Sequence, residues 1–160
     1  MRLDPVGPFI YPGGNVLQRL TLRMFADYKV AGRENVPRSG PLIIVANHQS
    51  NFDPPLLGAS VPRRIWFLAK DTMFTNPAYR WFLTSYGAFP LDREGTDIRA
   101  YRWAVSKLQQ GGTLALFPEG TRSNGALQKA HPGVVRFALK SQASLLPVGI
   151  TGTEHLGTWA

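Results

Sequence analysis

The 160-residue sequence contains no cysteine. This absence excludes disulfide bridges, thiolate metal sites and a cysteine nucleophile, and it fits a reducing compartment. No apolar run approaches the roughly 18 residues that a membrane-spanning helix needs, and the N-terminus lacks the charged, apolar and small regions of a cleaved signal peptide. Repeats and low-complexity tracts are also missing. The length therefore predicts a single domain with a core that needs no covalent staples.

Several catalytic motifs are missing as well. The sequence has no G-x-S-x-G elbow, no Walker loop and no G-x-G-x-x-G fingerprint. The histidines at 48, 131 and 155 lack the spacing of metal ligands, so we predict neither a metal site nor a resident cofactor. A covalent enzyme intermediate has no obvious carrier, since Ser50 is only a weak candidate for a nucleophile. The pairs Gly13-Gly14 and Gly111-Gly112 are typical of turns.

The charge balance is strongly positive. Eighteen Lys and Arg residues face ten Asp and Glu residues, for a net charge of +8. Such a surface favours anionic lipid, phosphorylated substrates or nucleic acid as partners, and charge alone does not choose among them. No nucleic-acid-binding motif is present, and the tryptophans lie in core-like segments, so we predict no nucleic-acid partner.

Apolar runs alternate with segments of helical period, and this pattern predicts an α/β fold with a mixed, mostly parallel central sheet flanked by helices. The expected strands are 42–46, 65–69, 87–91, 113–117 and 145–150, with 27–32 as a weaker candidate. Four helices are expected: one that starts at 53, two over 77–86 and 96–112, and one that starts near 132. Pro90 removes a ladder donor, so the strand over 87–91 is expected at a sheet edge or broken there.

The N-terminal part contains an amphipathic stretch over 15–28. Val16, Leu17, Leu20, Met24 and Tyr28 fall near one helical face. That face either docks on the domain's own core or lies on a membrane surface. We assign residues 1–36 to this N-terminal segment and residues 37–160 to the main domain.

The stretch NHQSNFDPP, residues 47–55, places a histidine and an aspartate directly behind a strand. His48 is a suitable proton acceptor when a carboxylate fixes its tautomer, and a sharp turn would let Asp53 reach the ring. The alternatives are a structural histidine in a loop and an aspartate that only caps the next helix. In parallel sheets functional residues gather at the carboxyl ends of strands, so His48 and Glu119 are expected at one crevice.

A second stretch, FPEGTRS, follows the strand over 113–117. Gly120 permits a close backbone approach, Thr121 and Ser123 offer hydroxyl groups, and the fork of Arg122 suits a phosphate. The alternative is an ordinary turn with a surface ion pair between Glu119 and Arg122.

Two further cations follow strands. Arg93 either joins Arg122 at one anion or pairs with the neighbouring Asp92 or Glu94. Lys70 follows the strand over 65–69 and is either a ligand for the same anion or a flanking surface lysine.

These stretches together resemble the glycerolipid acyltransferase family, the 1-acyl-sn-glycerol-3-phosphate acyltransferases and their relatives. Four blocks occur in the family's order over residues 47–153: NHQSNFD, FLAKDTMFTNPAYRWFLTSYGAFPLDR, FPEGTRS and LLPVGITGT. Family members usually continue with more sheet and helix after the fourth block, so we expect either a compact member or a C-terminally short chain.

The resemblance implies transfer of a fatty acyl group from acyl-CoA or acyl-carrier protein to the hydroxyl of a lysophosphatidate-type acceptor in phospholipid synthesis. It assigns His48 as general base, Asp53 as its orienting partner and Glu119 to the acceptor or histidine site. Arg93 and Arg122 become phosphate contacts, with Gly120 and Thr121 shaping the loop and Lys70 nearby. Pro147 belongs to the block tied to the acyl donor. An oxyanion would be stabilised by N–H groups at the helix start behind Asp53.

The resemblance also implies a peripheral enzyme at the cytoplasmic face of a membrane, of unknown oligomeric state. Other readings stay open. The acceptor could instead be glycerol 3-phosphate, another lysolipid or a lipid alcohol without phosphate. In a different class, the chain would be a non-catalytic basic module that binds anionic membrane or nucleic acid.

Overall fold

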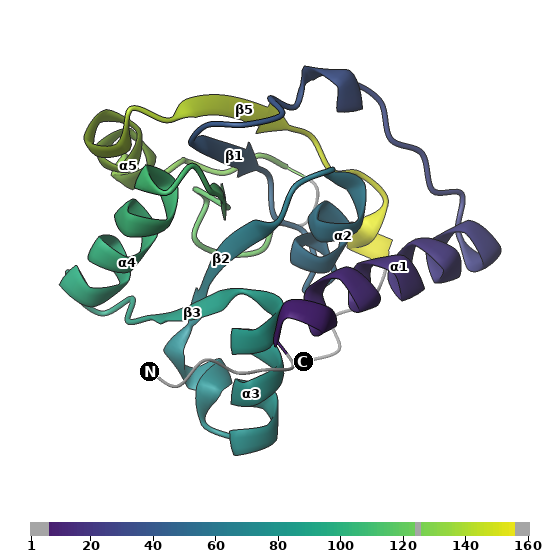
Figure 1. The fold of residues 1–160 in the computed structure, drawn as a ribbon, viewed down its shortest axis with the longest axis horizontal. Coiled ribbons are helices and arrows are strands. Elements are labelled where there is room, and N and C mark those ends of the chain that lie inside the picture. The colour runs from purple at the N-terminus through teal and green to yellow at the C-terminus, as the bar shows by residue number, and fades with distance from the viewer. Residues whose placement is uncertain (1–6, 124–125, 156–160) are drawn as a thin grey trace.

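The computed structural model describes residues 7–123 and 126–155, and its strands lie close to the five firmly predicted ones (Figure 1). The helices and strands, in chain order, are α1 (Gly7–Phe25), β1 (Leu42–Ala46), α2 (Asp53–Ser60), β2 (Ile65–Lys70), α3 (Pro77–Tyr86), β3 (Ala88–Leu91), α4 (Ile98–Gln109), β4 (Thr113–Leu116), α5 (Gly133–Ser141) and β5 (Ser144–Val148). Three short 3-10 helices, η1 (Arg33–Asn35), η2 (Asp71–Phe74) and η3 (Thr153–His155), lie in the connections.

The strands form one sheet in the order β3-β2-β4-β1-β5. All the strand pairs are parallel, so the antiparallel pairing that a mixed sheet would contain does not occur in the described part of the chain. β3 lies at one edge, as Pro90 led us to expect, and Pro147 lies in β5 at the other edge. Proline is tolerated in edge strands because a residue whose nitrogen faces away from the sheet has no partner strand to donate to.

Helices cover both faces of the sheet (Figure 1). Leu42 and Ile44 of β1 point to the face that α2 covers, where they pack with Leu57. Ile43, between them in sequence, points to the opposite face and packs with Leu108 of α4. This alternation follows from the two-residue period of a strand, and it explains why β1 is apolar along its whole length.

The strand order creates a switch point between β1 and β4. These strands are neighbours, yet the chain leaves β1 toward α2 on one face and leaves β4 toward α5 on the other. In parallel α/β sheets the crevice at such a point, outside the carboxyl ends of the strands, is the usual ligand site. The two motifs singled out in the sequence follow β1 and β4, so the fold brings them to this crevice.

Local sequence fixes the ends of the helices that flank the edge strand β3. The side chain of Asn76 accepts hydrogen bonds from the N–H groups of Ala78 and Tyr79 and caps α3, while Asp97 caps α4 by accepting from Ala100. Gly87 ends α3 in the left-handed region at φ 102°, a conformation that costs glycine little.

Two sequence predictions are wrong. Residues 27–32 form no strand; this segment is instead tied to the end of α2, where the hydroxyls of Tyr28 and Ser60 are hydrogen-bonded at 2.8 Å. Gly13 and Gly14 lie inside α1, because contacts with the core override the weak helix propensity of glycine. The Tyr11 hydroxyl accepts from the N–H of Ile65 at 2.8 Å.

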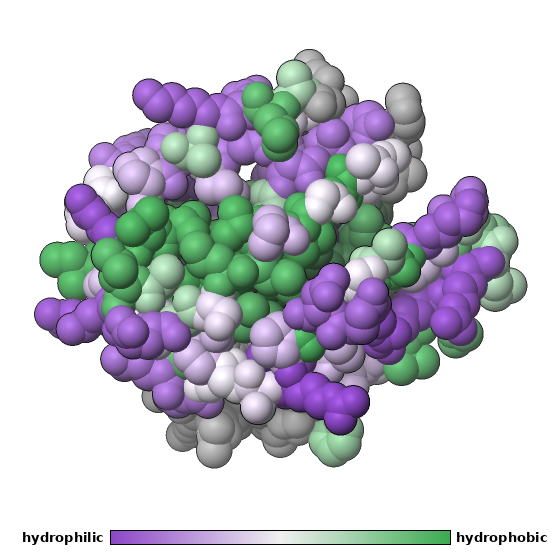
Figure 2. Space-filling view, turned by 90° about the horizontal axis from the view of Figure 1, so that it is seen from above, coloured by the Kyte–Doolittle hydropathy of each residue, from purple (hydrophilic) through white to green (hydrophobic). Residues whose placement is uncertain are grey.

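α1 docks on the domain with a face other than its apolar one. Tyr11 and Asn15 are buried, and the Tyr86 hydroxyl donates to Asn15 Oδ1 at 2.6 Å. The predicted apolar face is exposed instead: Leu17 is 67% exposed and Met24 is 73% exposed. Among the described residues, no helix combines the length and apolarity needed to cross a bilayer. A second hydrophobic area lies where β5 forms the sheet edge (Figure 2), and it includes Leu145.

Candidate active site

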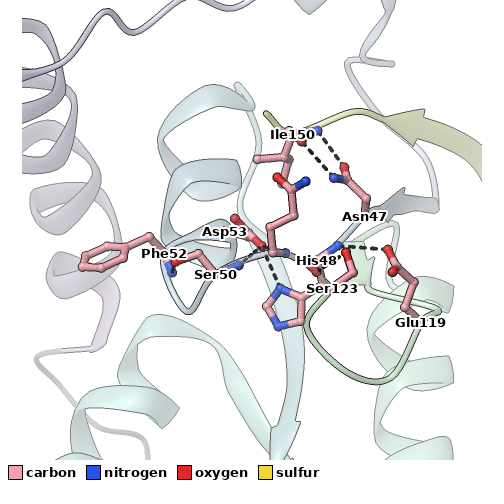
Figure 3. A network of polar contacts seen from close by, with 9 residues as sticks. Asn47, His48, Ser50, Phe52, Asp53, Glu119, Ser123 and Ile150 are labelled. Atoms are coloured by element: carbon pink, nitrogen blue, oxygen red, sulfur yellow. Dashed lines mark hydrogen bonds and ion pairs between the residues drawn. The ribbon is translucent and has the colours of Figure 1, made fainter. Parts of the chain in front are cut away.

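The segment after β1 is anchored by Asn47. Its side-chain amide donates to the carbonyl of Ile150 at 2.8 Å, and its Oδ1 accepts from the N–H of Ile150 at 2.7 Å. This two-way bond ties the end of β1 to the segment that follows β5 (Figure 3). It fixes the point at which the chain turns away from the sheet and presents His48.

His48 and Asp53 form the predicted dyad. His48 Nδ1 lies 2.8 Å from Asp53 Oδ2. The same oxygen accepts the main-chain N–H groups of Gln49 at 2.7 Å and Ser50 at 2.8 Å. Asp53 is the first residue of α2 and makes no helix-capping bond, so the capping alternative is wrong. Its carboxylate turns back into the 48–53 turn, because that turn offers three donors to one oxygen.

The hydrogen bonds fix the proton on the imidazole. Burial raises the pKa of the Asp53 carboxyl, but the hydrogen bonds it accepts, led by that from the His48 ring, hold the pKa below its ordinary value. The carboxylate is therefore ionised near neutral pH and can only accept, so we assign the proton to Nδ1. Nε2 then carries the free lone pair and makes no hydrogen bond with a described residue. It points away from Asp53 (Figure 3).

The imidazole is held on a second side by an aromatic ring. Phe117, directly after β4, stacks on it with 4.3 Å between ring centroids. The His48 side chain is 15% exposed and that of Asp53 is 0% exposed. The dyad is thus shielded from water around Nδ1, where competition from water would weaken the hydrogen bond to the carboxylate.

Glu119 meets the histidine through the backbone. Its Oε1 accepts the main-chain N–H of His48 at 3.2 Å, and its Oε2 accepts that of Gln128 at 3.1 Å. Both oxygens of this buried carboxylate are used in this way, and Glu119 forms no ion pair with Arg122. The surface ion pair that sequence left open is therefore ruled out for these two side chains.

Ser123 completes the junction between the two motifs. Its N–H donates to the carbonyl of His48 at 2.8 Å, and its hydroxyl donates to the same oxygen at 3.3 Å. The 117–123 loop is thereby bonded to both the N–H and the carbonyl of His48.

The remaining predicted residues make fewer contacts with the dyad and with the 117–123 loop. Arg93 reaches the loop, where its Nη1 donates to the carbonyl of Gly120 at 2.5 Å, and it pairs with neither Asp92 nor Glu94. Gly120 itself has φ 67°, and a Cβ there would meet the ring of His131 at 3.1 Å. Thr121, Arg122 and Lys70 are exposed, and no hydrogen bond or ion pair joins them to the dyad.

The start of α2 does not supply the expected oxyanion donors. Pro54 and Pro55 have no N–H. The N–H of Asp53 donates to the carbonyl of Ser50, and that of Leu56 donates to the carbonyl of Phe52. The positions that would face an oxyanion at this helix end are thus either prolines or already engaged.

Sequence reasoning missed the roles of Asn47 and Phe117. Both directly adjoin the motifs that it did select, Asn47 before His48 and Phe117 before FPEGTRS. An asparagine directly behind a strand is the available signal for Asn47, because a half-buried amide requires partners for its N–H and C=O groups. Within residues 7–123 and 126–155, no three acidic or histidine side chains gather as metal ligands would.

Comparison with known proteins agrees with this geometry. The family model described as Acyltransferase matches residues 27–151. A 1-acyl-sn-glycerol-3-phosphate acyltransferase of Streptococcus pneumoniae is 31% identical over 71% of this chain and 43% of its own length, and that of Bacillus subtilis is 29% identical over 84% and 67%. The crystal structure of the 1-acyl-sn-glycerophosphate acyltransferase PlsC from Thermotoga maritima superposes with a TM-score of 0.72 at 34% identity, covering 94% of this chain and 60% of that one.

The chain thus spans between two fifths and two thirds of the length of these relatives. The resemblance seen in the four sequence blocks is confirmed, since the family model covers more than half of the residues and the parallel sheet matches that of the solved relative. The chain belongs to the Acyltransferase family.

Proposed function

We propose that the protein transfers a fatty acyl group from a thioester to the hydroxyl of a lysophosphatidate-type acceptor. The observation that carries the proposal is the His48–Asp53 pair, with a free Nε2 at the switch point between β1 and β4. The names of the relatives support the acceptor class, because those from Streptococcus pneumoniae and Bacillus subtilis are 1-acyl-sn-glycerol-3-phosphate acyltransferases.

In the proposed step, Nε2 of His48 removes the proton from the acceptor hydroxyl as its oxygen attacks the thioester carbonyl. The new C–O bond forms, the C–S bond breaks, and the leaving thiolate takes the proton back from the imidazolium. Asp53 stabilises that imidazolium, as the carboxylate of a catalytic triad does. No protein-bound acyl group is required. The acyl donor is proposed to be acyl-CoA or acyl-carrier protein, with no resident cofactor.

Arg93 and Arg122 are proposed to bind the acceptor phosphate. Arg93 donates one N–H to the carbonyl of Gly120, and the other N–H groups of its guanidinium remain available. Arg122 is exposed on the 117–123 loop, which also contains Gly120. Guanidinium groups suit phosphate because they donate two parallel hydrogen bonds. Glu119, Gly120 and Thr121 hold or form the loop between them, and Lys70 adds positive charge at the end of β2.

A second acceptor class rests on one relative. A lyso-ornithine lipid O-acyltransferase of Pseudomonas aeruginosa is 34% identical over 84% of this chain and 51% of its own length. Acceptor head groups therefore differ among relatives of similar identity, and a lyso-ornithine lipid belongs in the assay beside lysophosphatidate.

We further propose a peripheral position at the cytoplasmic face of a membrane. The net charge of +8 and the exposed apolar face of α1 in the N-terminal segment support it.

The test is an acyl-transfer assay that combines both donor types with lysophosphatidate, glycerol 3-phosphate and lyso-ornithine lipid, with mass spectrometry of the products. Formation of a diacylglycerol phosphate from lysophosphatidate by the wild-type protein and not by His48→Ala is the expected result. Turnover of lyso-ornithine lipid alone would move the assignment to the second acceptor class. Binding to anionic vesicles without any turnover would favour the non-catalytic module.

A further inference from the structure

A basic pocket lies away from the dyad, between α1, the segment that follows it and the end of α2. It has a volume of about 250 Å³, and its lining residues are Arg19, Arg23, Tyr28, Val30, Arg33, Ala59 and Ser60. Asp53 begins α2 and Ser60 ends it. Eight residues of helix rise about 12 Å, so the pocket and the dyad are at opposite ends of the same helix.

The pocket concentrates positive charge without a counter-charge. Arg19, Arg23 and Arg33 all line it, and none of them forms an ion pair with a described residue. Arg19 is held in place because its Nε donates to the carbonyl of Ala59. Three guanidinium groups around one hollow repel one another and are relieved by an anion with several oxygens, as in a phosphate group.

Hydroxyl groups complete the wall of the pocket. Those of Tyr28 and Ser60 are hydrogen-bonded to each other at 2.8 Å, which ties the segment after α1 to the end of α2. The Ser60 hydroxyl also donates to the carbonyl of Leu56 at 2.7 Å, so its bond with Tyr28 uses the Tyr28 proton. The pocket is therefore built from two elements joined by a polar contact, and the arginines supply the donors for an anion.

The helix that supplies two of the arginines also exposes an apolar face. Val16, Leu20 and Met24 recur every four residues, so they share one side of α1, and all are more than half exposed. Arg19 and Arg23 recur at the same spacing on the adjoining side, between this apolar face and the buried Asn15. If the apolar face enters a lipid layer, the two arginines come to the depth of the head groups, where lipid phosphates lie.

We propose that this pocket binds the phosphate group of an anionic phospholipid when α1 lies on a membrane. Such binding would fix the rotation of α1 about its own axis and hence the orientation of the whole domain on the lipid surface. The site differs from the proposed acceptor site, which involves Arg93 and Arg122.

The test is binding of the full chain to phosphatidylcholine vesicles with and without phosphatidylglycerol, measured by co-sedimentation. The double variant Arg23→Gln/Arg33→Gln should lose roughly 10-fold or more of its partitioning onto the anionic vesicles. Arg102→Gln/Arg136→Gln, which removes two exposed arginines from α4 and α5 on the other face of the sheet, is the charge-matched control and should lose less than about 3-fold. Thermal unfolding of both variants checks that they are folded.

Equal losses in the two double variants would overturn the proposal, because binding would then follow net charge alone. Tight binding of inorganic phosphate without vesicles, lost in Arg23→Gln/Arg33→Gln, would assign the pocket to a soluble phosphate and overturn the lipid assignment. His48→Ala should bind vesicles like the wild type. The outcome is therefore independent of whether the proposed acyl transfer is correct.

Discussion

Glu119 accepts a hydrogen bond from the main-chain N–H of His48 at 3.2 Å, while the imidazole of the same residue pairs with Asp53 at 2.8 Å. Two carboxylates thus act on one histidine at different points. Glu119 positions the chain, and Asp53 positions the ring and its proton. Substitutions at the three residues should therefore be distinguishable by kinetics, pH dependence and stability.

Replacement of His48 by alanine or glutamine should reduce acyl transfer by about 10²- to 10⁴-fold, the usual contribution of a general base. Binding of the acceptor should change little, because the base acts mainly in the transition state. Steady-state kinetics with separate kcat and KM values checks this. Activity within a few-fold of wild type in both variants would contradict the assignment of the base.

Asp53→Asn keeps the size of the side chain but removes its charge. The amide oxygen can take the place of Oδ2 and keep the hydrogen bonds from Nδ1, Gln49 and Ser50, but the neutral side chain no longer stabilises the imidazolium that forms during the reaction. We expect a loss in kcat of about 10²-fold or more, with correctly folded protein. Steady-state kinetics measures the loss and thermal unfolding checks the fold; activity within a few-fold of wild type in a folded variant would contradict the mechanism.

The acid stability of the protein should depend on Asp53. Its pKa is below the ordinary value in the folded state, so its ionised form contributes stability above the unfolded pKa of about 4, and this contribution is lost as pH falls through the folded pKa. In urea unfolding between pH 7 and pH 3, Asp53→Asn should therefore lose less stability on acidification than the wild type. Parallel curves for the two proteins would show that the carboxylate is not the linked group.

Glu119→Gln should destabilise the fold by about 1–3 kcal/mol, because glutamine offers one acceptor oxygen where the carboxylate serves the N–H groups of both His48 and Gln128. Glu94→Gln is the matched control, since Glu94 is exposed beyond β3. Its expected change is within about 0.5 kcal/mol. Urea unfolding at pH 7 measures the stability of both variants. Equal stabilities would show that the two hydrogen bonds accepted by Glu119 do not contribute to the stability of the fold.

Gly58→Ala should weaken the packing of α1 on the domain. A Cβ at Gly58 would lie 2.6 Å from the Tyr86 hydroxyl and 3.0 Å from Asn15 Oδ1, and the hydrogen bond between these two atoms is one of those that hold α1 on the domain. We expect the free energy of unfolding to fall by about 1–3 kcal/mol. Gly13→Ala, also helical but with nothing within 4 Å of its Cβ, should instead stabilise by about 0.5–1 kcal/mol. Thermal unfolding distinguishes the two, and a neutral Gly58→Ala would show that α1 adjusts freely.

Local features of the fold followed from the sequence. The continuous apolar runs at β1 and β4 are those of strands buried on both faces, and Asn76-Pro77 marks the start of α3. Pro90 correctly indicated an edge strand, because a proline lacks the N–H that an inner strand must donate. The partner of His48 was also within reach of sequence, since the ring and Asp53 belong to one short turn.

Other features depended on contacts between distant segments. Glycine propensity suggested a turn at Gly13-Gly14, but the anchoring of Tyr11 and Asn15 keeps α1 helical through them. The helix start behind Asp53 looked suitable for an oxyanion, yet its two prolines have no N–H and the neighbouring donors are engaged. Amphipathic periodicity located an apolar face on α1 and gave no sign that the face points away from the domain.

The amino-acid sequence by itself determined the strands, the turn that pairs His48 with Asp53, and the family resemblance, because each depends on residues close together in the chain. Only the tertiary structure decided that β1 lies beside β4. As a consequence, Glu119 accepts a hydrogen bond from the backbone N–H of His48 and not from its ring. Strand order depends on how the crossover helices pack on the two faces of the sheet, and that packing is a property of the whole folded domain.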